Sequence, residues 1–425
     1  MIETNFKNSE VGMIPVEWEA APLASIGEVK MCKRILKEQT AVSGDVPFYK
    51  IGTFGKEPDA YIPRWLYEQF KSMYPYPKKG TILISAAGTI GRTVVFDGAD
   101  AYFQDSNIVW IEHNEKAVVN QYLEHFFKVI NWKSENGGTI SRLYNDNLKS
   151  TYLCYPLDKA EQIRIATALS DMDKLISTLK KLIEKKRNIK QGALEELLTG
   201  KRRIIGFTKS KSFISTSIGM IPKDWSVSPL NKLCTLKARI GWQGLTTGEY
   251  LEQGDYILIT GTDFKDGYID WNTCNYVSKW RYEQDSNIQI KEGDVLISKD
   301  GTIGKVAYLN HIPMEGTLNS GVFVVRPKNE NIITKSYLSW LFKSVWFRTF
   351  IDQLSGGSTI NHLFQKDFEK FNLVYPSDII EQSAIANVLS DMDSEISALE
   401  SRLDKYQNLK QGMMQQLLTG KIRFI

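Results

Sequence analysis

The segment Glu161–Lys201, EQIRIATALSDMDKLISTLKKLIEKKRNIKQGALEELLTGK, decides the fold because the chain repeats it at Glu381–Lys421. The shift is the same at both ends (381 − 161 = 421 − 201 = 220), so no residue has been gained or lost between the copies. An ungapped match over this length excludes chance. A unit that occurs twice in one chain is typical of a two-fold arrangement, and two-fold objects commonly bind two-fold partners.

The repeat extends upstream of this segment, where the shifts between the copies become smaller. An Ile-Pro-x-x-Trp opening, a Gly-x-Ile-Gly turn and a Gly-Gly-(Ser)-Thr-Ile loop precede each copy in the same order. The unit is therefore a variable block followed by a closely copied block, used twice. The matching upstream pairs are Gly12–Trp18 with Gly219–Trp225, Ile84–Gly91 with Ile297–Gly304, and Gly137–Ile140 with Gly356–Ile360.

Length and composition are those of an ordinary globular protein. The chain has 425 residues, 42% hydrophobic and 24% charged, which predicts two or more domains with their own cores. The net charge of +4 permits a polyanionic partner without requiring one. The N-terminus has no apolar signal region and no apolar run reaches the length of a membrane span, so we expect a cytoplasmic protein.

Cysteine and histidine point to no cofactor. The four cysteines contain no CxxC pair, and the four histidines fall at no metal-ligand spacing. Reduced, partly buried thiols are the simpler interpretation.

The copied blocks are predicted to be long helices. Apolar residues of the first copy step by four and three positions, which is the a/d seam of a coiled coil. Lys186, Lys190 and Lys410 interrupt the seams, either as contacts for a partner or as a solvated face. Gly200 and Gly420 stand where a C-terminal glycine cap is expected. The seam residues of the first copy are Ile165, Leu169, Met172, Ile176, Leu179 and Ile183.

Two helices that each expose an apolar stripe should bury the stripes together. Antiparallel pairing would place the variable blocks at opposite ends of a rod, since about 40 residues at about 1.5 Å each span roughly 60 Å. The alternative is that each helix packs onto its own variable block as ordinary core.

The variable blocks are predicted to be compact α/β domains in which strands dominate. Paired strands joined by a glycine-bearing loop are predicted at 80–85 with 93–96 and at 293–298 with 305–308. Further apolar strands are expected at 108–111 and 322–325, and helices at 120–132 and 334–350.

The order and content of these motifs resemble the specificity (S) subunit of type I restriction-modification systems. The resemblance runs from Gly12 to Lys421 and occurs twice in the same order. Two departures concern a Pro-Pro pair and an Asn-Gln pair that are frequent in the family, and the second leaves the role of those loop residues open. They fall at Tyr155–Pro156 and Tyr375–Pro376, with one proline each, and at Asp105–Ser106 and Asn319–Ser320.

The resemblance implies a pseudo-two-fold α/β protein with two target-recognition domains separated by a long antiparallel two-helix coiled coil. Each domain would read one half of a bipartite, asymmetric double-stranded DNA target, with half-sites about one duplex turn, roughly 10 bp, apart. The helices would set this gap and dock two modification subunits, and restriction subunits would join that core. The expected boundaries are 1–157 for the first recognition domain, 158–201 for the first helical spacer, 202–377 for the second domain with a linker at 202–218, and 378–425 for the second spacer.

Readout of base edges requires side chains with paired donors and acceptors on loops or on an element that fits a groove. Both variable blocks offer such residues. For each one alone a solvated surface position is the alternative, so they carry weight as a set. The DNA-binding candidates are Lys33, Arg34, Lys50, Thr53, Arg92, Gln104 and Asn107 in the first block, and Arg239, Trp242, Gln243, Thr260, Lys299, Lys305 and Asn319 in the second.

Catalytic motifs are missing from the sequence. It has no Asn-Pro-Pro-aromatic motif, no glycine-rich cofactor strand and no nucleophile–base constellation, and Gly301–Lys305 does not have P-loop spacing. We therefore predict a non-catalytic subunit without cofactor or metal, and the resemblance implies that S-adenosylmethionine binds to an adenine-methylating partner. The alternatives are a protein–protein scaffold, which the 11% aromatic content would also suit, and a methyltransferase.

Overall fold

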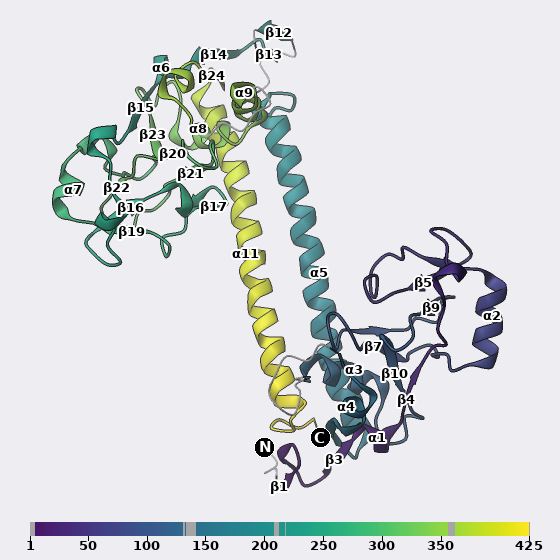
Figure 1. The fold of residues 1–425 in the computed structure, drawn as a ribbon. Helices are drawn as coiled ribbons and strands as arrows, with labels where there is room; N and C mark the ends of the chain where they lie inside the picture. Colours follow the sequence, from purple (N-terminus) through teal and green to yellow (C-terminus); the bar gives the residue numbers. More distant parts are fainter. Residues whose placement is uncertain are drawn as a thin grey trace. The chain divides into compact units, whose positions relative to one another are not determined.

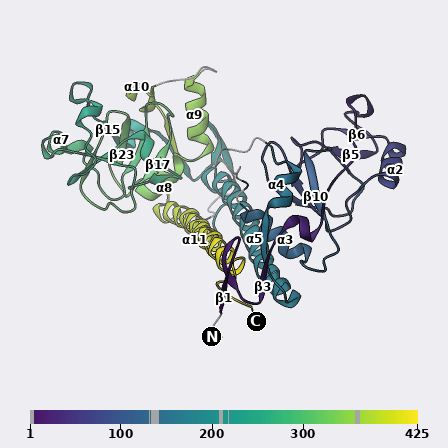
Figure 2. The same cartoon turned by 60° about the horizontal axis from the view of Figure 1, so that its bottom comes forward.

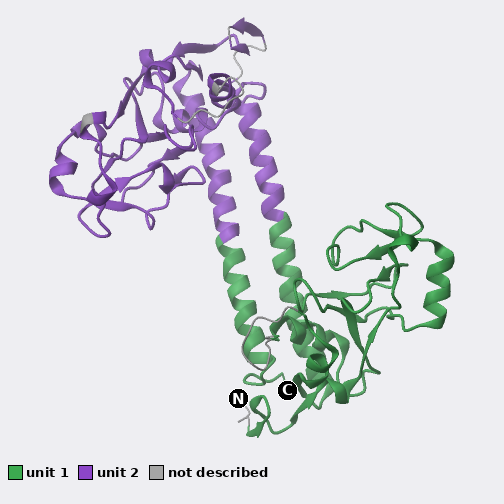
Figure 3. Cartoon of the chain, viewed as in Figure 1, with its two compact units in different colours: residues 1–181, 401–425 green, residues 182–400 purple. Residues whose placement is uncertain are grey.

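The chain forms two compact units in the computed structural model, which describes residues 5–130, 132, 142–207, 212–216, 218–355 and 362–424. Unit 1 comprises residues 1–181 and 401–425, and unit 2 comprises residues 182–400 (Figure 3). The copied blocks form two long helices, α5 (Lys159–Leu198) and α11 (Ile379–Leu417). Each unit therefore contains one variable block, the first part of the helix that follows it and the last part of the other long helix. The Gly137–Ile140 and Gly356–Ile360 loops lie outside the described residues.

Unit 1 is built around a four-stranded antiparallel sheet with the order β4-β10-β7-β8 (Figure 1). A second sheet, β6-β5-β9, contains one parallel pair, β5 with β9. A β1–β2 hairpin and a β3–β11 pair complete the strands. The bounds are β1 Phe6–Ser9, β2 Gly12–Pro15, β3 Trp18–Pro22, α1 Leu23–Ile26, β4 Glu28–Met31, η1 Lys37–Gln39, β5 Val46–Tyr49, β6 Tyr61–Ile62, α2 Arg64–Met73, β7 Ile82–Ser85, β8 Thr93–Val95, β9 Tyr102–Phe103, β10 Ile108–Glu112, α3 Asn120–Val129, α4 Asn145–Ser150 and β11 Tyr152–Pro156.

Unit 2 has the same plan (Figure 2). Its sheets are β15-β23-β20-β21 and β19-β16-β22, the latter with β16 and β22 parallel, and it adds a β17–β18 hairpin. The bounds are β12 Phe213–Thr216, β13 Gly219–Pro222, β14 Trp225–Pro229, α6 Leu230–Leu233, β15 Cys234–Ala238, η2 Gly241–Gln243, η3 Thr247–Glu249, β16 Tyr256–Ile259, η4 Gly261–Asp263, β17 Phe264–Lys265, β18 Tyr268–Ile269, β19 Asn275–Val277, α7 Lys279–Glu283, η5 Ser286–Ile288, β20 Val295–Ser298, β21 Val306–Tyr308, β22 Gly316–Leu318, β23 Val322–Pro327, α8 Lys335–Leu341, α9 Val345–Ser355, α10 Gln365–Phe368 and β24 Asn372–Pro376.

The four-stranded sheet of each unit is buried on both faces. Successive side chains of a strand point to opposite faces, so Ile82 and Ile84 of β7 join a core with α3 and α5, whereas Leu83 joins a second core with β5 and α2. Unit 2 repeats the division, with Val295 in one core and Leu296 in the other. Burial on both faces explains why these strands read as continuous apolar runs.

The two long helices run antiparallel where they meet within a unit. In unit 1, Asp173 of α5 forms an ion pair with Lys410 of α11, with 2.5 Å between Oδ1 and Nζ. In unit 2 the same contact recurs with the partners exchanged, between Lys190 and Asp393. The seam also takes part in the domain cores, because Ile165 and Leu169 are fully buried among residues of the first variable block. Both expected arrangements of the helices are therefore present within unit 1.

The lysines that interrupt the seams are neither fully solvated nor unpaired. Lys190 and Lys410 each meet an aspartate of the other long helix, and Lys186 meets Glu395 at 2.7 Å. The end of each long helix follows the prediction, since Gly200 and Gly420 have φ angles of +69° and +71°. A Cβ at either glycine would lie 2.3–2.5 Å from a proline side chain, so only glycine fits.

The repeated Glu-Gln pair fastens each long helix to its variable block. The amide of Gln162 accepts from Val119 N and donates to Ala117 O and Pro156 O at 2.8–2.9 Å. Gln382 makes the same three contacts in unit 2. The glutamate before each glutamine is buried and binds an arginine: Glu161 with Arg423, and Glu381 with Arg203. The copied residues thus build the same joint twice.

Helix limits differ from the prediction in two places. The helix expected at 120–132, α3, ends at Val129 rather than at residue 132. The expected helix at 334–350 is broken into α8 and α9, with Ser344 Oγ donating to Leu341 O at the break. The break allows both Phe342 and Phe347 to pack against Phe368, which a straight helix would not present together.

Candidate nucleic-acid interface

A tight glycine turn follows the central strand of each variable block. In unit 1, Ser85 Oγ donates to Thr89 O at 2.5 Å and accepts from Arg92 N at 2.9 Å. Ser298 makes the same two contacts in unit 2, at 2.6 and 2.9 Å. The glycines of both turns have φ angles between +65° and +76°, which side-chain-bearing residues rarely adopt. These glycines have a structural role. The turn of unit 2 also lines a cavity, through residues 300–302 and Lys305.

The cavity of unit 1 is rich in cationic side chains and has a volume of about 670 Å³. It brings together four predicted residues, Arg34, Lys50, Gln104 and Asn107. Carboxylates hold the two cations, since Arg34 Nε lies 2.9 Å from Asp105 and Lys50 Nζ lies 2.9 Å from Asp59. These acids orient the cations while leaving further donor hydrogens available.

Arg142 also lines this cavity, and sequence reasoning missed it. Its Nη2 atom donates to Ser106 O at 3.2 Å and to Ser106 Oγ at 2.8 Å. Ser106 has a φ angle of +53°, so this residue is held in a left-handed conformation. Because the sequence before Arg142 has no periodic pattern, only its place in the fold identifies it.

The other three predicted residues of the first block lie outside this cavity. Lys33 Nζ lies 5.1 Å from the centre of the Tyr74 ring. Thr53 Oγ1 accepts from Lys50 N at 3.1 Å and so supports the loop after β5. The Arg92 guanidinium donates to Phe54 O at 3.0 Å and braces the glycine turn.

The cavity of unit 2 has a volume of about 570 Å³ and is lined mainly by hydroxyl, amide and carboxylate groups. Of the predicted residues it contains Thr260, Lys305 and Asn319, together with Asp300. Asn319 Oδ1 accepts a hydrogen bond from Gly321 N at 2.9 Å, and the side-chain nitrogen of Asn319 takes no part in that bond. Asp300 Oδ1 is hydrogen bonded to His362 Nδ1, a pair that the sequence did not suggest.

Arg239 is buried and forms hydrogen bonds inside unit 2. Only 2% of its surface is exposed, and its guanidinium donates to Leu318 O at 2.9 Å and to Thr317 Oγ1 at 3.1 Å. Burial lowers the pKa of this guanidinium. Gln243 is also buried, and Lys299 lies over the Phe323 ring at 5.1 Å. The side chain of Trp242 is outside the described part of the chain.

The two cavities occupy equivalent places in the two units. Gln104 N donates to Tyr49 O at 2.9 Å, and Asn319 N donates to Ile259 O at 3.0 Å, in each case just beyond a parallel strand pair. Lys50 follows β5 as Thr260 follows β16. The same framework therefore presents cationic groups in one unit and mostly neutral or acidic groups in the other.

Other chemistry is not evident in the described residues. No group of three or more His, Cys, Asp and Glu side chains in that part of the chain could hold a metal ion. All four cysteines are free and buried, and burial raises the pKa of the Cys32 and Cys154 thiols to about 12 and about 11. Among the helices described, none has the length and apolar character needed to cross a membrane.

A family model and curated relatives match this chain in sequence. A family model described as the type I restriction modification DNA specificity domain matches residues 15–187 and 222–410. A Haemophilus influenzae protein assigned as a type I restriction enzyme specificity subunit is 59% identical over 157 residues, which are 37% of this chain and 40% of that protein. The Methanocaldococcus jannaschii protein assigned as the MjaX specificity subunit is 28% identical over 440 residues, covering 99% of this chain and 97% of the relative.

Two solved structures have the same fold. The S subunit of a type I restriction-modification system from M. genitalium aligns with a TM-score of 0.60 at 15% identity, covering 98% of this chain and 97% of that one. A chain from a structural study of type I complex assembly and conformational transition aligns with a TM-score of 0.55 at 13% identity, covering 96% and 99%. Both carry two mixed helix–strand domains, as this chain does.

Proposed function

Because the chain belongs to the type I restriction-modification DNA specificity family, we propose that its two variable blocks read the two halves of a bipartite DNA target. The observation that carries this proposal is the pair of cavities at equivalent positions with unlike linings. Arg and Lys side chains suit the acceptors of guanine, whereas Asn and Asp suit adenine and cytosine. We propose a guanine in the half-site of the first block and an asymmetric composite target.

The long helices act in this proposal as the spacer between the two readers. Ion pairs that repeat with a 220-residue shift, Asp173–Lys410 and Asp393–Lys190, support an antiparallel coiled coil with a pseudo-two-fold axis. The spacers would be residues 158–201 and 378–425, and the readers 1–157 and 202–377. Half-sites would then lie about 10 bp apart, centre to centre.

The copied blocks look alike to a partner, which supports docking of two identical modification subunits. The chain itself would catalyse nothing and would act in the cytoplasm, where it places an adenine of each half-site before a modification subunit. S-adenosylmethionine would bind to that subunit, and restriction subunits would complete the complex.

Mapping of methylated adenines across the genome, with and without this gene, tests the proposal. A split motif with a fixed gap should disappear when the gene is deleted. Exchange of residues 202–377 for the corresponding block of another family member should replace one half-site only. Retention of both original half-sites after the exchange would exclude modular reading.

Binding of duplex DNA that weakens steeply with salt separates this function from a protein–protein scaffold. Methyl transfer by the purified chain alone would instead make it an enzyme.

A further inference from the structure

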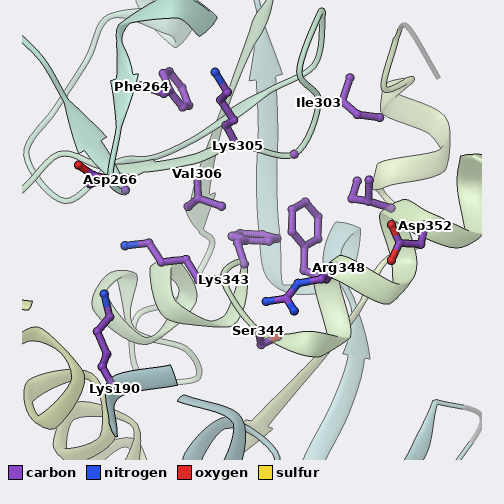
Figure 4. Close-up of a pocket in the computed structure, with 15 residues that line it drawn as sticks. Lys190, Phe264, Asp266, Ile303, Lys305, Val306, Lys343, Ser344, Arg348 and Asp352 are labelled. Carbon is purple, nitrogen blue, oxygen red and sulfur yellow. The ribbon is translucent and has the colours of Figure 1, made fainter. Parts of the chain in front are cut away.

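Unit 2 contains a further cavity, of about 500 Å³, beside the proposed base-reading cavity (Figure 4). Its walls come from four segments: the turn between β17 and β18, the glycine turn at 303–305, the break between α8 and α9, and Lys190 of α5. Lys305 lines both this cavity and the base-reading cavity. The glycine turn therefore separates two neighbouring cavities of different chemistry.

Four cationic side chains line this second cavity: Lys190, Lys305, Lys343 and Arg348. Two acidic side chains, Asp266 and Asp352, line it as well. Lys190 is neutralised by Asp393 of α11. Among the described residues, no ion pair is formed by the other three cations, although the charge of Asp393 also acts on Lys343.

Lys343 is held in this cavity by aromatic faces. Its Nζ atom lies 4.3 Å from the centre of the Trp340 ring and 5.2 Å from that of Tyr268. Gly267 leaves room for the ammonium group, because a Cβ at that position would lie 2.3 Å from Lys343 Nζ. Burial lowers the pKa of Lys343 to about 8, so its positive charge is poorly solvated. A bound anion would supply the missing compensation.

The described residues of unit 1 do not repeat this arrangement at the equivalent place. The hydroxyl groups of Tyr122 and Tyr337 donate to Cys154 O and Val374 O, which aligns α3 with α8. Six residues after each tyrosine stand Lys128 and Lys343.

Lys128 differs from Lys343 in being paired within unit 1. Its ammonium group lies 2.7 Å from Glu124 and 3.6 Å from Asp173. The counterpart of Lys305 is Arg92, whose guanidinium is bound to Phe54 O. In unit 1, therefore, the counterpart of Lys343 is neutralised by carboxylates, and the counterpart of Lys305 is hydrogen bonded to a backbone oxygen of the same unit.

We propose that this cavity of unit 2 binds a phosphate group of the DNA backbone through Lys343, Lys305 and Arg348. The inference rests on the proposed DNA-reading function and deepens it. Because Lys305 belongs to both cavities, the phosphate is one within or next to the half-site read by the second block. Phosphate contacts of this kind set the register of a protein on the duplex, so the site positions the second block over its bases.

The salt dependence of DNA binding tests the site. The full chain with its modification subunits is titrated with a short duplex that carries the mapped target, at several salt concentrations. Lys343→Met keeps an unbranched side chain and removes the charge, and the loss of one phosphate contact should lower the slope of log K against log salt by about 0.9. Lys343→Arg should retain the slope of the wild type. Lys128→Met is the matched control, and it should leave the slope unchanged.

Neutral methylphosphonate linkages, placed one at a time in the duplex, identify the phosphate. At one position near the second half-site the linkage should weaken binding by the wild type and should not weaken binding by Lys343→Met further. An unchanged slope for Lys343→Met, or the absence of such a position, would overturn the site. A cooperative thermal transition of Lys343→Met, followed by circular dichroism, shows that the variant has folded. The wild-type slope of Lys343→Arg separates the effect of charge from that of packing.

Inorganic phosphate distinguishes the DNA backbone from a free anion. If phosphate raises the Tm of the wild type but not of Lys343→Met, while the slope of DNA binding is the same for both, the cavity serves a free anion and the backbone assignment is wrong. If the wild type shows no salt-dependent binding of duplex at all, the DNA-reading function itself fails. If the wild type binds duplex with the expected salt dependence and Lys343→Met has the same slope, the phosphate site alone is wrong.

Discussion

Replacement of Arg203 by alanine should destabilise unit 2 strongly, because it leaves a buried carboxylate without its cation. Arg203 donates to both carboxylate oxygens of Glu381, at 2.5 and 2.7 Å, and to both of Asp224, at 2.9 and 3.0 Å. The side chains of Arg203 and Glu381 are only 7% and 2% exposed. Removal of one partner from a buried ion pair costs about 3–5 kcal/mol, a large fraction of the stability of a domain.

The free energy of unfolding can be followed by urea titration of the full chain, with far-UV circular dichroism. The equivalent variant in unit 1, Arg423→Ala, should cost about 1 kcal/mol less. The reason is that its second partner, Glu17, is 65% exposed, and an exposed ion pair contributes only about 0–1 kcal/mol.

The stability lost in Arg203→Ala should also depend on pH. Burial raises the pKa of Glu381 above the ordinary value of 4.5 despite the opposing effect of Arg203, and removal of Arg203 should raise the pKa further. A carboxyl group with a higher pKa in the folded state binds its proton more tightly there, so this contribution to stability is present below pH 4.5. It is lost as the pH rises through the raised pKa. The difference between Arg203→Ala and the wild type should therefore be larger at pH 8 than at pH 5.

Two outcomes would refute this reasoning. One is a cost of less than about 1 kcal/mol for Arg203→Ala at pH 8, which would mean that Glu381 is not confined to an apolar site. The other concerns the double variant Arg203→Met with Glu381→Met, which removes both charges. Asp224, which is 19% exposed, also loses Arg203 but stays partly solvated, so the double variant should recover much of the stability lost in Arg203→Ala. A double variant as unstable as Arg203→Ala would show that packing rather than the buried charge is responsible.

Further predictions concern single residues. Gly200→Ala should lose more than about 1 kcal/mol of stability because of its positive φ angle and its contact with a proline, whereas Gly192→Ala, with nothing near its Cβ, should gain about 0.5–1 kcal/mol; urea titration compares the two. Gln382→Ala should cost about 1–3 kcal/mol by leaving buried backbone groups unpaired, which thermal melting would measure. Asn319→Ala should alter only the second half-site in a methylation map, and a change in the first would contradict the assignment of cavities. The Cys32 thiol, with a pKa of about 12, should react with a thiol reagent at pH 8 only as fast as unit 1 opens.

Regular elements followed from local patterns in the sequence. Strands were predicted at 80–85 and 293–298 from apolar runs beside glycine-bearing loops, and the structure has them at Ile82–Ser85 and Val295–Ser298. The long helices were predicted from periodicity, and the structure confirms them. Prediction failed where a distant residue controls the outcome. The helix expected at 334–350 breaks because Phe342 and Phe347 share a core with Phe368 of α10, and no pattern within the helix signals this.

The candidate site was predictable as a region rather than residue by residue. The loops after β5 and β16 supply residues to the two cavities, and Arg34, Lys50, Thr260 and Asn319 line them as a set. Arg239 has the same residue type and a similar loop setting, yet it donates hydrogen bonds inside unit 2. Residue type and loop position do not reveal whether a guanidinium faces solvent or the interior.

The sequence by itself determined the repeat of the long helices, because an ungapped copy with a heptad step predicts two like helices that each carry an apolar stripe. Tertiary structure alone decided which charges are neutralised. Lys190 and Lys410 form ion pairs with aspartates more than 200 positions away, and Lys128 does so with Glu124 and Asp173. Lys343 forms no ion pair with any described residue. The physical reason is that helix and strand periodicity is a local property of the chain, whereas the electrostatic environment of a charge depends on every segment that folds around it.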